Sequence, residues 1–391
     1  MKKLMLPLLV LLFITKASMA STYIVKSEQE FKAILPKIVP GDHIIIANGT
    51  YSNWSLEIPT KGTKSKPVVV SAETAGKVIF NGEVNQTLFK LTGEFTTLSG
   101  ITFNACTLLK ANGANGILVE FKNTSNCRLN DCRFVANVVK GQFMPLVIIS
   151  GNGTANQVDG CTFNANVDNQ DVQVKITKDS CPQKTLIENN VFTNKNKVSW
   201  SNGNGGECIQ IGQDPILLGT KEANSIVRAN RFVHCDGENE VISNKSSRNS
   251  YLKNYFEACD GELVMRGGHD CIISENVFEG GTGGIRINGT GHIITNNKIN
   301  NIKTAIRLMY GMAKGKEETG FYIAASNSTI TNNQISNANT GILVGDSKNA
   351  DWTGKFDTVR YPSRVMQDVA PFDNKISGNT FSNTKNAIVN Q

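Results

Sequence analysis

The stretch that decides the fold lies between residues 235 and 288, where the tetrapeptide Cys-Asp-Gly-Glu occurs twice, at 235–238 and at 259–262. The two copies begin 24 residues apart (235 to 259). A short period of this kind is typical of a solenoid, in which each coil covers the apolar face of its neighbour. Residues that are distant in the chain then come together on one face of successive coils.

Outside this stretch, the repeat can be phased on an asparagine that stands two residues before an apolar residue. This pattern occurs at Asn190, Asn230, Asn254, Asn276, Asn297, Asn333 and Asn379. Upstream, Phe103, Phe134 and Phe163 hold the apolar position, with Ile101, Cys132 and Cys161 in the asparagine slot. Asparagine tolerates left-handed turns and can hydrogen-bond to stacked copies of itself, which suits a ladder at one corner of a coil. The sequence therefore predicts an all-β fold, a right-handed parallel β-helix.

An antiparallel β-sandwich would also give many short strands, but it does not explain stacking at one period with asparagine in a fixed phase. Solenoids need an atypical end unit, and residues 22–47 have the pattern of a cap with a strand, an amphipathic helix at 27–35 and a second strand. Long insertions are expected at residues 194–206, 312–326 and 345–373, where they wall a groove or cover an end. We expect residues 21–391 to form a single β-helix domain and the protein to be a monomer.

The N-terminus has the features of a secretory signal peptide. Lys2 and Lys3 precede an apolar run at residues 4–14, and the small residues 17–20 supply a cleavage site after Ala20. A membrane anchor is the alternative, but about 11 apolar residues are too few to span a bilayer. We therefore expect an exported protein, periplasmic or secreted, without stable insertion into a membrane.

The formal net charge is +7, and removal of Lys2, Lys3 and Lys16 with the signal peptide would leave +4. A modest positive excess suits an acidic polymer as partner. Nucleic acid is not expected as a partner, because an exported protein without a dense basic run lacks the usual means of binding it.

Nine cysteines in an exported chain first suggest disulfides, and an odd number leaves at least one unpaired. Several of them, however, keep a fixed distance from the repeated phenylalanine: Cys106, Cys132, Cys161, Cys235 and Cys259. Equivalent positions in neighbouring coils stack, so we interpret these five as small buried residues in ladders. The pairing of the other cysteines stays open.

Charged residues gather on three successive coils of the predicted solenoid. They are Glu238, Glu240, Lys245, Arg266 and Arg286. Because side chains alternate across a strand, Glu240, Arg266 and Arg286 are expected to face outward. Coil offsets of 24 and then 22 residues predict that Glu240 pairs with Val264 and Arg286, and that Arg266 pairs with Ile242 and Asn288.

This cluster has two interpretations from the residues alone. It could be a solvated network of salt bridges, which are common on surfaces and contribute little. Alternatively, Glu238, Glu240 and an asparagine carbonyl from residues 202–207 offer the oxygen ligands that Ca²⁺ prefers. A cation beside a base and an arginine is what removal of a proton α to a carboxylate requires.

The motifs of this region resemble those of polysaccharide lyase family six, the alginate lyases and chondroitinase B. The matching segments are Asn-Gly-Gly-Glu at 204–207, Cys-Asp-Gly-Glu-Asn-Glu-Val-Ile-Ser-Asn-Lys-Ser at 235–246, Leu-Val-Met-Arg-Gly at 263–267 and Gly-Gly-Ile-Arg-Ile-Asn-Gly at 283–289. Cap motifs at 40–42, 49–51 and 61–67 are similar as well, so the resemblance extends to about residue 345.

The resemblance implies a role for each matching residue in β-elimination from a uronate polymer. Lys245 would be the base that removes the C5 proton, and Arg266 would protonate or stabilise the leaving O4. Asn204, Glu238 and Glu240 would hold Ca²⁺, which neutralises the uronate carboxylate. Arg286 would bind a neighbouring uronate.

Two positions depart from the family pattern. The family has Arg-His-Gly where this chain has Arg266-Gly267-Gly268, with His269 two positions late, and it has arginine where this chain has Gln210. Gln210 and His269 are therefore expected to supply substrate contacts in altered form. Glycine permits the backbone bend that would bring the His269 ring back towards the site.

The leading hypothesis is a calcium-assisted lyase acting on alginate. A lyase for dermatan or chondroitin sulfate is the alternative within enzymes, and a noncatalytic β-helix that binds acidic glycans is the alternative outside them. A pectin-type hydrolase is disfavoured, since the outward cluster lacks a set of closely spaced aspartates for activating water.

Overall fold

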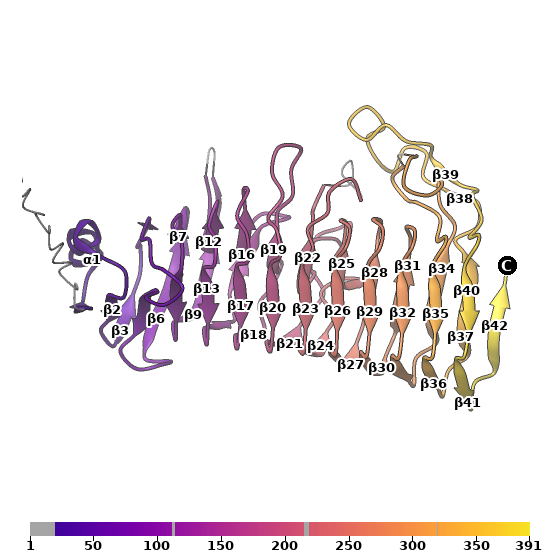
Figure 1. Ribbon diagram of the computed structural model, residues 1–391, viewed down its shortest axis with the longest axis horizontal. Coiled ribbons are helices and arrows are strands. Elements are labelled where there is room, and N and C mark those ends of the chain that lie inside the picture. Colours follow the sequence, from indigo (N-terminus) through magenta and orange to yellow (C-terminus); the bar gives the residue numbers. More distant parts are fainter. Residues whose placement is uncertain (1–19, 112–113, 215–218, 319) are drawn as a thin grey trace, which may run out of the picture.

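Three long parallel β-sheets run the length of the molecule, as the ribbon view shows (Figure 1). The structure is a computed structural model that describes residues 20–111, 114–214, 219–318 and 320–391. The predicted signal peptide falls on residues 1–19 and Ala20, so all but its last residue lie outside the described part. Each coil contributes one short strand to each sheet, which is the parallel β-helix that the sequence predicts.

The strands of each sheet follow one another in chain order. The first sheet contains β1 (Thr22–Val25), β2 (His43–Ile46), β5 (Val68–Ala72), β8 (Thr96–Ser99), β13 (Arg128–Asn130), β17 (Gln157–Asp159), β20 (Leu186–Glu188), β23 (Ile226–Arg228), β26 (Ser250–Leu252), β29 (Ile272–Ser274), β32 (Ile293–Thr295), β35 (Thr329–Thr331) and β40 (Lys375–Ser377). The second contains β3 (Gly49–Tyr51), β6 (Val78–Val84), β9 (Thr102–Leu108), β14 (Arg133–Val135), β18 (Thr162–Asn164), β21 (Val191–Lys195), β24 (Arg231–Cys235), β27 (Tyr255–Cys259), β30 (Val277–Gly281), β33 (Lys298–Asn300), β36 (Gln334–Ser336) and β41 (Thr380–Ser382), with β15 (Val138–Val139) paired to β9. The third contains β4 (Leu56–Ile58), β7 (Thr87–Leu91), β12 (Ile117–Lys122), β16 (Pro145–Ser150), β19 (Gln170–Val174), β22 (Ile209–Ile211), β25 (Glu240–Asn244), β28 (Glu262–Met265), β31 (Gly283–Ile287), β34 (Thr304–Met309), β37 (Thr340–Asp346) and β42 (Asn386–Asn390).

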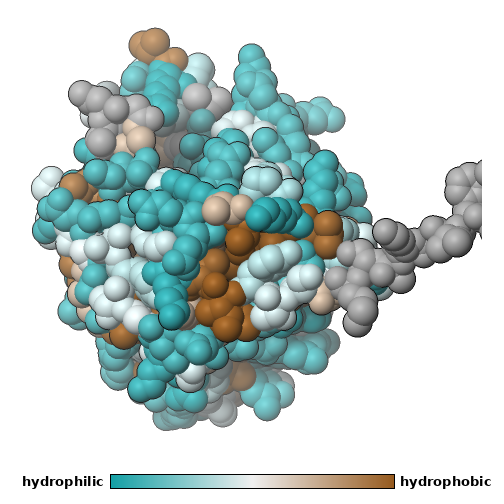
Figure 2. Space-filling view, turned by 90° about the vertical axis from the view of Figure 1, so that its left-hand side faces the viewer, coloured by the Kyte–Doolittle hydropathy of each residue, from teal (hydrophilic) through white to brown (hydrophobic). Residues whose placement is uncertain are grey.

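The N-terminal cap is built around the helix α1 (Glu28–Ile34), followed by the 3₁₀ turn η1 (Leu35–Lys37). The Ser27 hydroxyl caps the helix by accepting a hydrogen bond from the Glu30 backbone N–H, as the sequence Ser-x-x-Glu favours. Phe31 is fully buried and packs edge-on against Trp54. Figure 2, which faces this end of the molecule, shows hydrophilic residues over most of the surface and one apolar patch.

The predicted asparagine ladder stands at the turn between the first and second sheets. From Asn230 onward, each ladder asparagine accepts hydrogen bonds through Oδ1 from the backbone N–H and the side-chain Nδ2 of the asparagine one coil earlier, over 2.9–3.1 Å. Asn190, the first of them, accepts from the backbone N–H of Cys161. The left-handed backbone lies one position earlier, at residues such as Asn189 and Lys253. The ladder asparagines are therefore required for buried hydrogen bonds rather than for a left-handed turn.

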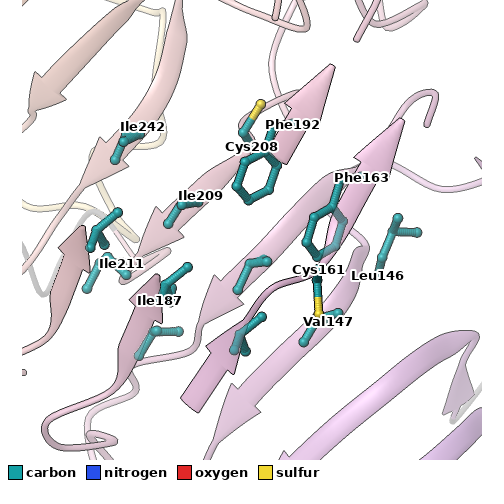
Figure 3. Close-up of a cluster of buried hydrophobic side chains, with 14 of the residues drawn as sticks. Leu146, Val147, Cys161, Phe163, Ile187, Phe192, Cys208, Ile209, Ile211 and Ile242 are labelled. Carbon is teal, nitrogen blue, oxygen red and sulfur yellow. The ribbon is translucent and has the colours of Figure 1, made fainter. Parts of the chain in front are cut away.

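Phenylalanine rings stack inside the coils directly after the ladder. Consecutive rings from Phe103 to Phe278 have centroids 4.4–4.9 Å apart. Figure 3 shows Phe163 and Phe192 among the aliphatic side chains and cysteines of the same interior. All nine cysteines are free and eight of them are buried, which confirms that the five phased cysteines are small buried residues.

The coil register around residue 240 differs from the prediction. Glu262 pairs with Glu240, not with Glu238, because four residues separate Cys235 from Glu240 and only two separate Cys259 from Glu262. A β-bulge between Glu240 and Ile242 then shifts the pairing by one more residue.

As a result of this shift, Val264 pairs with Ser243 rather than with Glu240. Arg266 comes after the end of β28, where its N–H donates to the carbonyl of Asn244 rather than lying opposite Ile242. The predicted pairing of Val264 with Arg286 is correct.

The three predicted insertions all border the third sheet. Residues 196–208 lead from β21 into β22, whereas residues 310–328 and 347–374 lead away from β34 and β37. Two loops each contain a pair of short antiparallel strands. One pair is β10 (Lys110–Ala111) with β11 (Ala114–Asn115), and the other is β38 (Ala350–Asp351) with β39 (Met366–Gln367). Figure 1 shows the longest loop, with β38 and β39, standing above the last coils. No helix within the described residues is both long and apolar enough to cross a membrane.

Candidate active site

Three glutamates from two neighbouring coils meet at one edge of the third sheet. Glu207 comes two residues before β22, and Glu238 and Glu240 lie just before and at the start of β25. One carboxylate oxygen of each lies within 4.8 Å of those of the other two. Residues Gln170 and Gln210 orient Glu207, since each donates a side-chain N–H to one of its carboxylate oxygens.

The arrangement disfavours ionisation of Glu238. Its Oε2 accepts hydrogen bonds from the backbone N–H groups of Gly205, over 2.6 Å, and Gly206, over 3.4 Å. Burial and the nearby charges of Glu207 and Glu240 nevertheless raise its pKa to about 9. The cluster thus holds more negative charge than its protein neighbours neutralise, which is the condition for binding a cation.

Glu240 links the acidic cluster to two arginines. Its Oε1 accepts a hydrogen bond from Arg286 Nη2 over 2.7 Å and lies 3.7 Å from Arg266 Nε. Burial opposes ionisation of this carboxyl, but Arg266 and Arg286 outweigh it and lower the pKa of Glu240 to about 2. Its other oxygen, Oε2, is buried without a hydrogen-bond partner among the described residues, and so are Arg266 Nε and Arg286 Nε.

Lys245 follows the last residue of β25 and is fixed by its backbone, whose N–H donates to the carbonyl of Ile211 over 2.8 Å. Only 6% of the residue is exposed. Burial and the positive charge of Arg266 lower the pKa of the Lys245 ammonium, against the opposing pull of the three glutamates. The surroundings of Lys245 thus shift its amine towards the neutral form.

Arg266 lies between Glu240 and an aromatic surface. Its Nη2 donates a hydrogen bond to the hydroxyl of Tyr322 over 2.8 Å. The guanidinium carbon stands 5.4 Å from the centre of the Tyr322 ring and 5.6 Å from that of Phe321. Burial disfavours the charged form, but Tyr322 and Glu240 outweigh this and raise the pKa of Arg266. The guanidinium therefore stays protonated and acts by donating hydrogen bonds.

A groove of about 500 Å³ continues from Arg286 towards the C-terminal coils. Arg286, Lys303 and Arg307 line it together with the acidic residues Asp260, Glu262 and Asp346. Arg307 is held by ion pairs to Glu262 and Asp346. The groove therefore presents basic side chains from successive coils, interspersed with acidic ones, beside the acidic cluster.

The structure brings four of the predicted site residues, Glu238, Glu240, Lys245 and Arg266, into one cluster with Arg286 beside it. Gln210 also lies there, but its amide supports Glu207 and accepts a hydrogen bond from Gln173 Nε2 over 2.7 Å.

Two predicted residues are engaged elsewhere. His269 is paired through Nδ1 with Asp270 at 2.8 Å. Asn204 is exposed, and its backbone holds the loop through Asn202 and Gln142. None of these hydrogen bonds involves the three glutamates.

Sequence reasoning missed two residues of the cluster. The sequence motifs mark Glu207 only as part of the segment 202–207, although its place two residues before a strand of the third sheet is a usable signal. Tyr322 gave no signal, because it lies in an insertion 56 residues away from Arg266.

A family model of chondroitinase B matches residues 25–390. Similar solved structures include a mutant of the family 6 alginate lyase AlyGC, with 25% identity and a TM-score of 0.74 over 92% of this chain and 49% of that one. A mannuronic acid-specific family 6 lyase from human gut microbiota is 26% identical, with a TM-score of 0.76 over 94% of this chain and 82% of that one.

A family 6 lyase from Pseudopedobacter saltans, 23% identical, shares the fold with a TM-score of 0.75 over 93% of this chain and 85% of that one. This chain spans about half the length of AlyGC. A comparison with curated proteins gives no match. On the family match over nearly its whole length, the chain belongs to the chondroitinase B family, polysaccharide lyase family 6.

Proposed function

We propose that the protein is an exported lyase that cleaves a uronate-containing polysaccharide, alginate before others, by β-elimination. The observation that carries this proposal is the convergence of a buried lysine with a lowered pKa, two arginines and a carboxylate cluster at one place on the third sheet. A solvated salt-bridge network would not leave Glu240 Oε2, Arg266 Nε and Arg286 Nε buried without partners among the described residues.

In this proposal Lys245 is the base. A neutral amine is needed to take the C5 proton of the uronate, and burial beside Arg266 favours that form. The electron pair of the C5–H bond becomes the C4–C5 double bond, and the C4–O4 bond breaks. Arg266 donates hydrogen bonds to the departing O4, which takes up a proton from solvent.

The acidic cluster fits a hard cation such as Ca²⁺. Three carboxylates within 4.8 Å, one of them with a free buried oxygen, offer the oxygen ligands that this ion prefers. Glu207, Glu238 and Glu240 would hold it, with Asn204 on the same loop as a further candidate. When bound, the ion would neutralise the uronate carboxylate and so make the C5 proton more acidic.

Alginate is favoured over chondroitin or dermatan sulfate as substrate. Similar solved structures at 25–26% identity include an alginate lyase and a mannuronic acid-specific lyase. Every residue of alginate carries a carboxylate, which suits the cations of Arg286, Lys303 and Arg307 on successive coils of the groove. The charge of these residues also suits a noncatalytic glycan-binding protein, which is the alternative function.

Absorbance of the unsaturated uronate product tests the proposal directly. The purified protein with Ca²⁺ should produce this ultraviolet signal from polymannuronate or polyguluronate, and not from chondroitin or dermatan sulfate. A signal from the sulfated polymers alone would reassign the substrate. Binding of the polymers without any signal would establish the noncatalytic function instead.

A further inference from the structure

The guanidinium of Arg266 is held by a single side-chain hydrogen bond among the described residues. Arg266 exposes 21% of its side chain, and its only hydrogen bond within the described residues goes from Nη2 to the Tyr322 hydroxyl. On its other side, Glu240 Oε1 lies 3.7 Å from Nε, attractive in charge but beyond hydrogen-bonding distance. The position of the guanidinium therefore depends on the balance between Tyr322 and Glu240.

Tyr322 is itself held firmly. The residue is 6% exposed, and its ring packs 5.3 Å from the Trp352 ring and 5.1 Å from the Phe321 ring. Trp352 belongs to the loop after β37, whereas Tyr322 and Phe321 belong to the loop after β34.

A hydrogen bond and a further ring contact join the same two loops. The Phe321 N–H donates to Ser363 Oγ over 2.9 Å, and the Phe321 and Phe356 rings stack 4.5 Å apart. Two insertions from different coils thus build one hydrophobic, mostly aromatic wall, which consists of Met312, Phe321, Tyr322, Trp352, Phe356 and Tyr361.

We propose that Tyr322 is a positioning residue for Arg266, and that packing between the two insertions places its hydroxyl beside the guanidinium. By accepting a hydrogen bond from Nη2, Tyr322 holds the guanidinium at its distance from Glu240, with Nε 3.7 Å from Oε1. Without the hydroxyl, attraction to the Glu240 carboxylate draws Arg266 across the short gap and shortens this ion pair to a hydrogen bond that competes with substrate.

This inference rests on the proposed function for its kinetic consequence, because Arg266 there stabilises the departing O4. Interactions made in the transition state appear in kcat, whereas uniform binding appears in KM. The loss of a hydrogen bond to a charged group typically changes a rate by about tenfold or more. A residue that only supported the fold would change thermal stability instead.

The test substitutes Tyr322→Phe, which removes the hydroxyl and keeps the ring in the wall. On the uronate polymer that the wild type cleaves, kcat is expected to fall by about tenfold or more while KM stays within about twofold. The thermal midpoint should match that of the wild type. Tyr361→Phe is the matched control, because it removes a hydroxyl from the same wall and leaves the Arg266 hydrogen bond in place.

Crystal structures of the wild type and Tyr322→Phe chains test the positioning without turnover. The guanidinium of Arg266 should move towards Glu240 in the variant. An unmoved guanidinium, an unchanged kcat, or a loss confined to KM would each overturn the inference. If the wild type cleaves no uronate polymer, the proposed function fails while the crystallographic comparison still decides the role of Tyr322.

Discussion

Glu240 Oε1 accepts a hydrogen bond from Arg286 Nη2 over 2.7 Å, although the two residues are 46 positions apart in the chain. Glu240 belongs to the acidic cluster and Arg286 lines the groove, so this contact joins the two. One carboxylate therefore faces both the candidate cation site and the residues expected to bind substrate.

Replacement of the proposed base should separate chemistry from folding. Lys245→Ala is expected to lower kcat by roughly 100- to 10,000-fold, the usual contribution of a general base. Lys253→Ala is a suitable control, since Lys253 is exposed and forms its ion pair with Glu275, outside the cluster. Near-normal turnover in Lys245→Ala would remove this residue from the mechanism.

The pH profile should report the lowered pKa of Lys245. The amine must be neutral to act, so the rate rises with pH as the ammonium loses its proton. Because the pKa lies below the ordinary value of 10.5, the midpoint of this rise is expected below that of an exposed lysine. Initial rates across the alkaline range measure it, and a midpoint at or above 10.5 would contradict the assignment.

Stability without divalent cations should fall as the pH rises. The pKa of Glu238 is raised to about 9 in the folded chain from an ordinary 4.5, so the folded state holds a proton that the unfolded state releases. Stability from this group is complete below about pH 4.5 and is lost as the pH approaches 9.

Thermal midpoints of the chelated protein between pH 5 and pH 9 measure this loss. Glu238→Gln removes the titrating group and should flatten that part of the profile. Identical slopes in the wild type and the variant would show that Glu238 is not the group responsible.

The cation requirement should depend on Glu207. Glu207→Gln removes one of three clustered charges and is expected to raise the Ca²⁺ concentration for half-maximal activity by about tenfold. Mg²⁺ should substitute poorly, because it demands stricter geometry and dehydrates reluctantly. Glu257→Gln is the control, because Glu257 lies on the second sheet, away from the cluster, with 37% of its side chain exposed. Full activity in exhaustively chelated enzyme would assign the three glutamates to a purely structural network.

His269 should contribute little, contrary to the expectation from the sequence. Its ring is engaged by Asp270, which also pairs with Lys316. His269→Ala is therefore expected to change kcat/KM by no more than about twofold, as for most surface substitutions. A tenfold loss would show that the ring swings to the substrate, as glycines 267 and 268 would permit.

The sequence determined the β-helix, its asparagine corner and its phenylalanine stack, because parallel coils repeat the same physical requirement at each turn. A buried asparagine such as Asn254 must satisfy its backbone and side chain through copies one coil away, so its spacing records the coil length. The same coil period predicts that Lys245 and Arg266 lie on neighbouring coils, whereas their roles follow from the resemblance to polysaccharide lyase family six.

Only the tertiary structure decided which residue pairs with Glu240 on the next coil and which side chains contact Arg266. Two extra residues in one turn and a bulge at residue 241 move the pairing of Glu240 without disturbing the repeat on either side. Tyr322 reaches Arg266 from an insertion that has no period, and the insertion is ordered by a second loop through Trp352 and Phe356. Contacts made by packing between unrelated loops leave no regular spacing in the chain, so no pattern in the sequence could predict them.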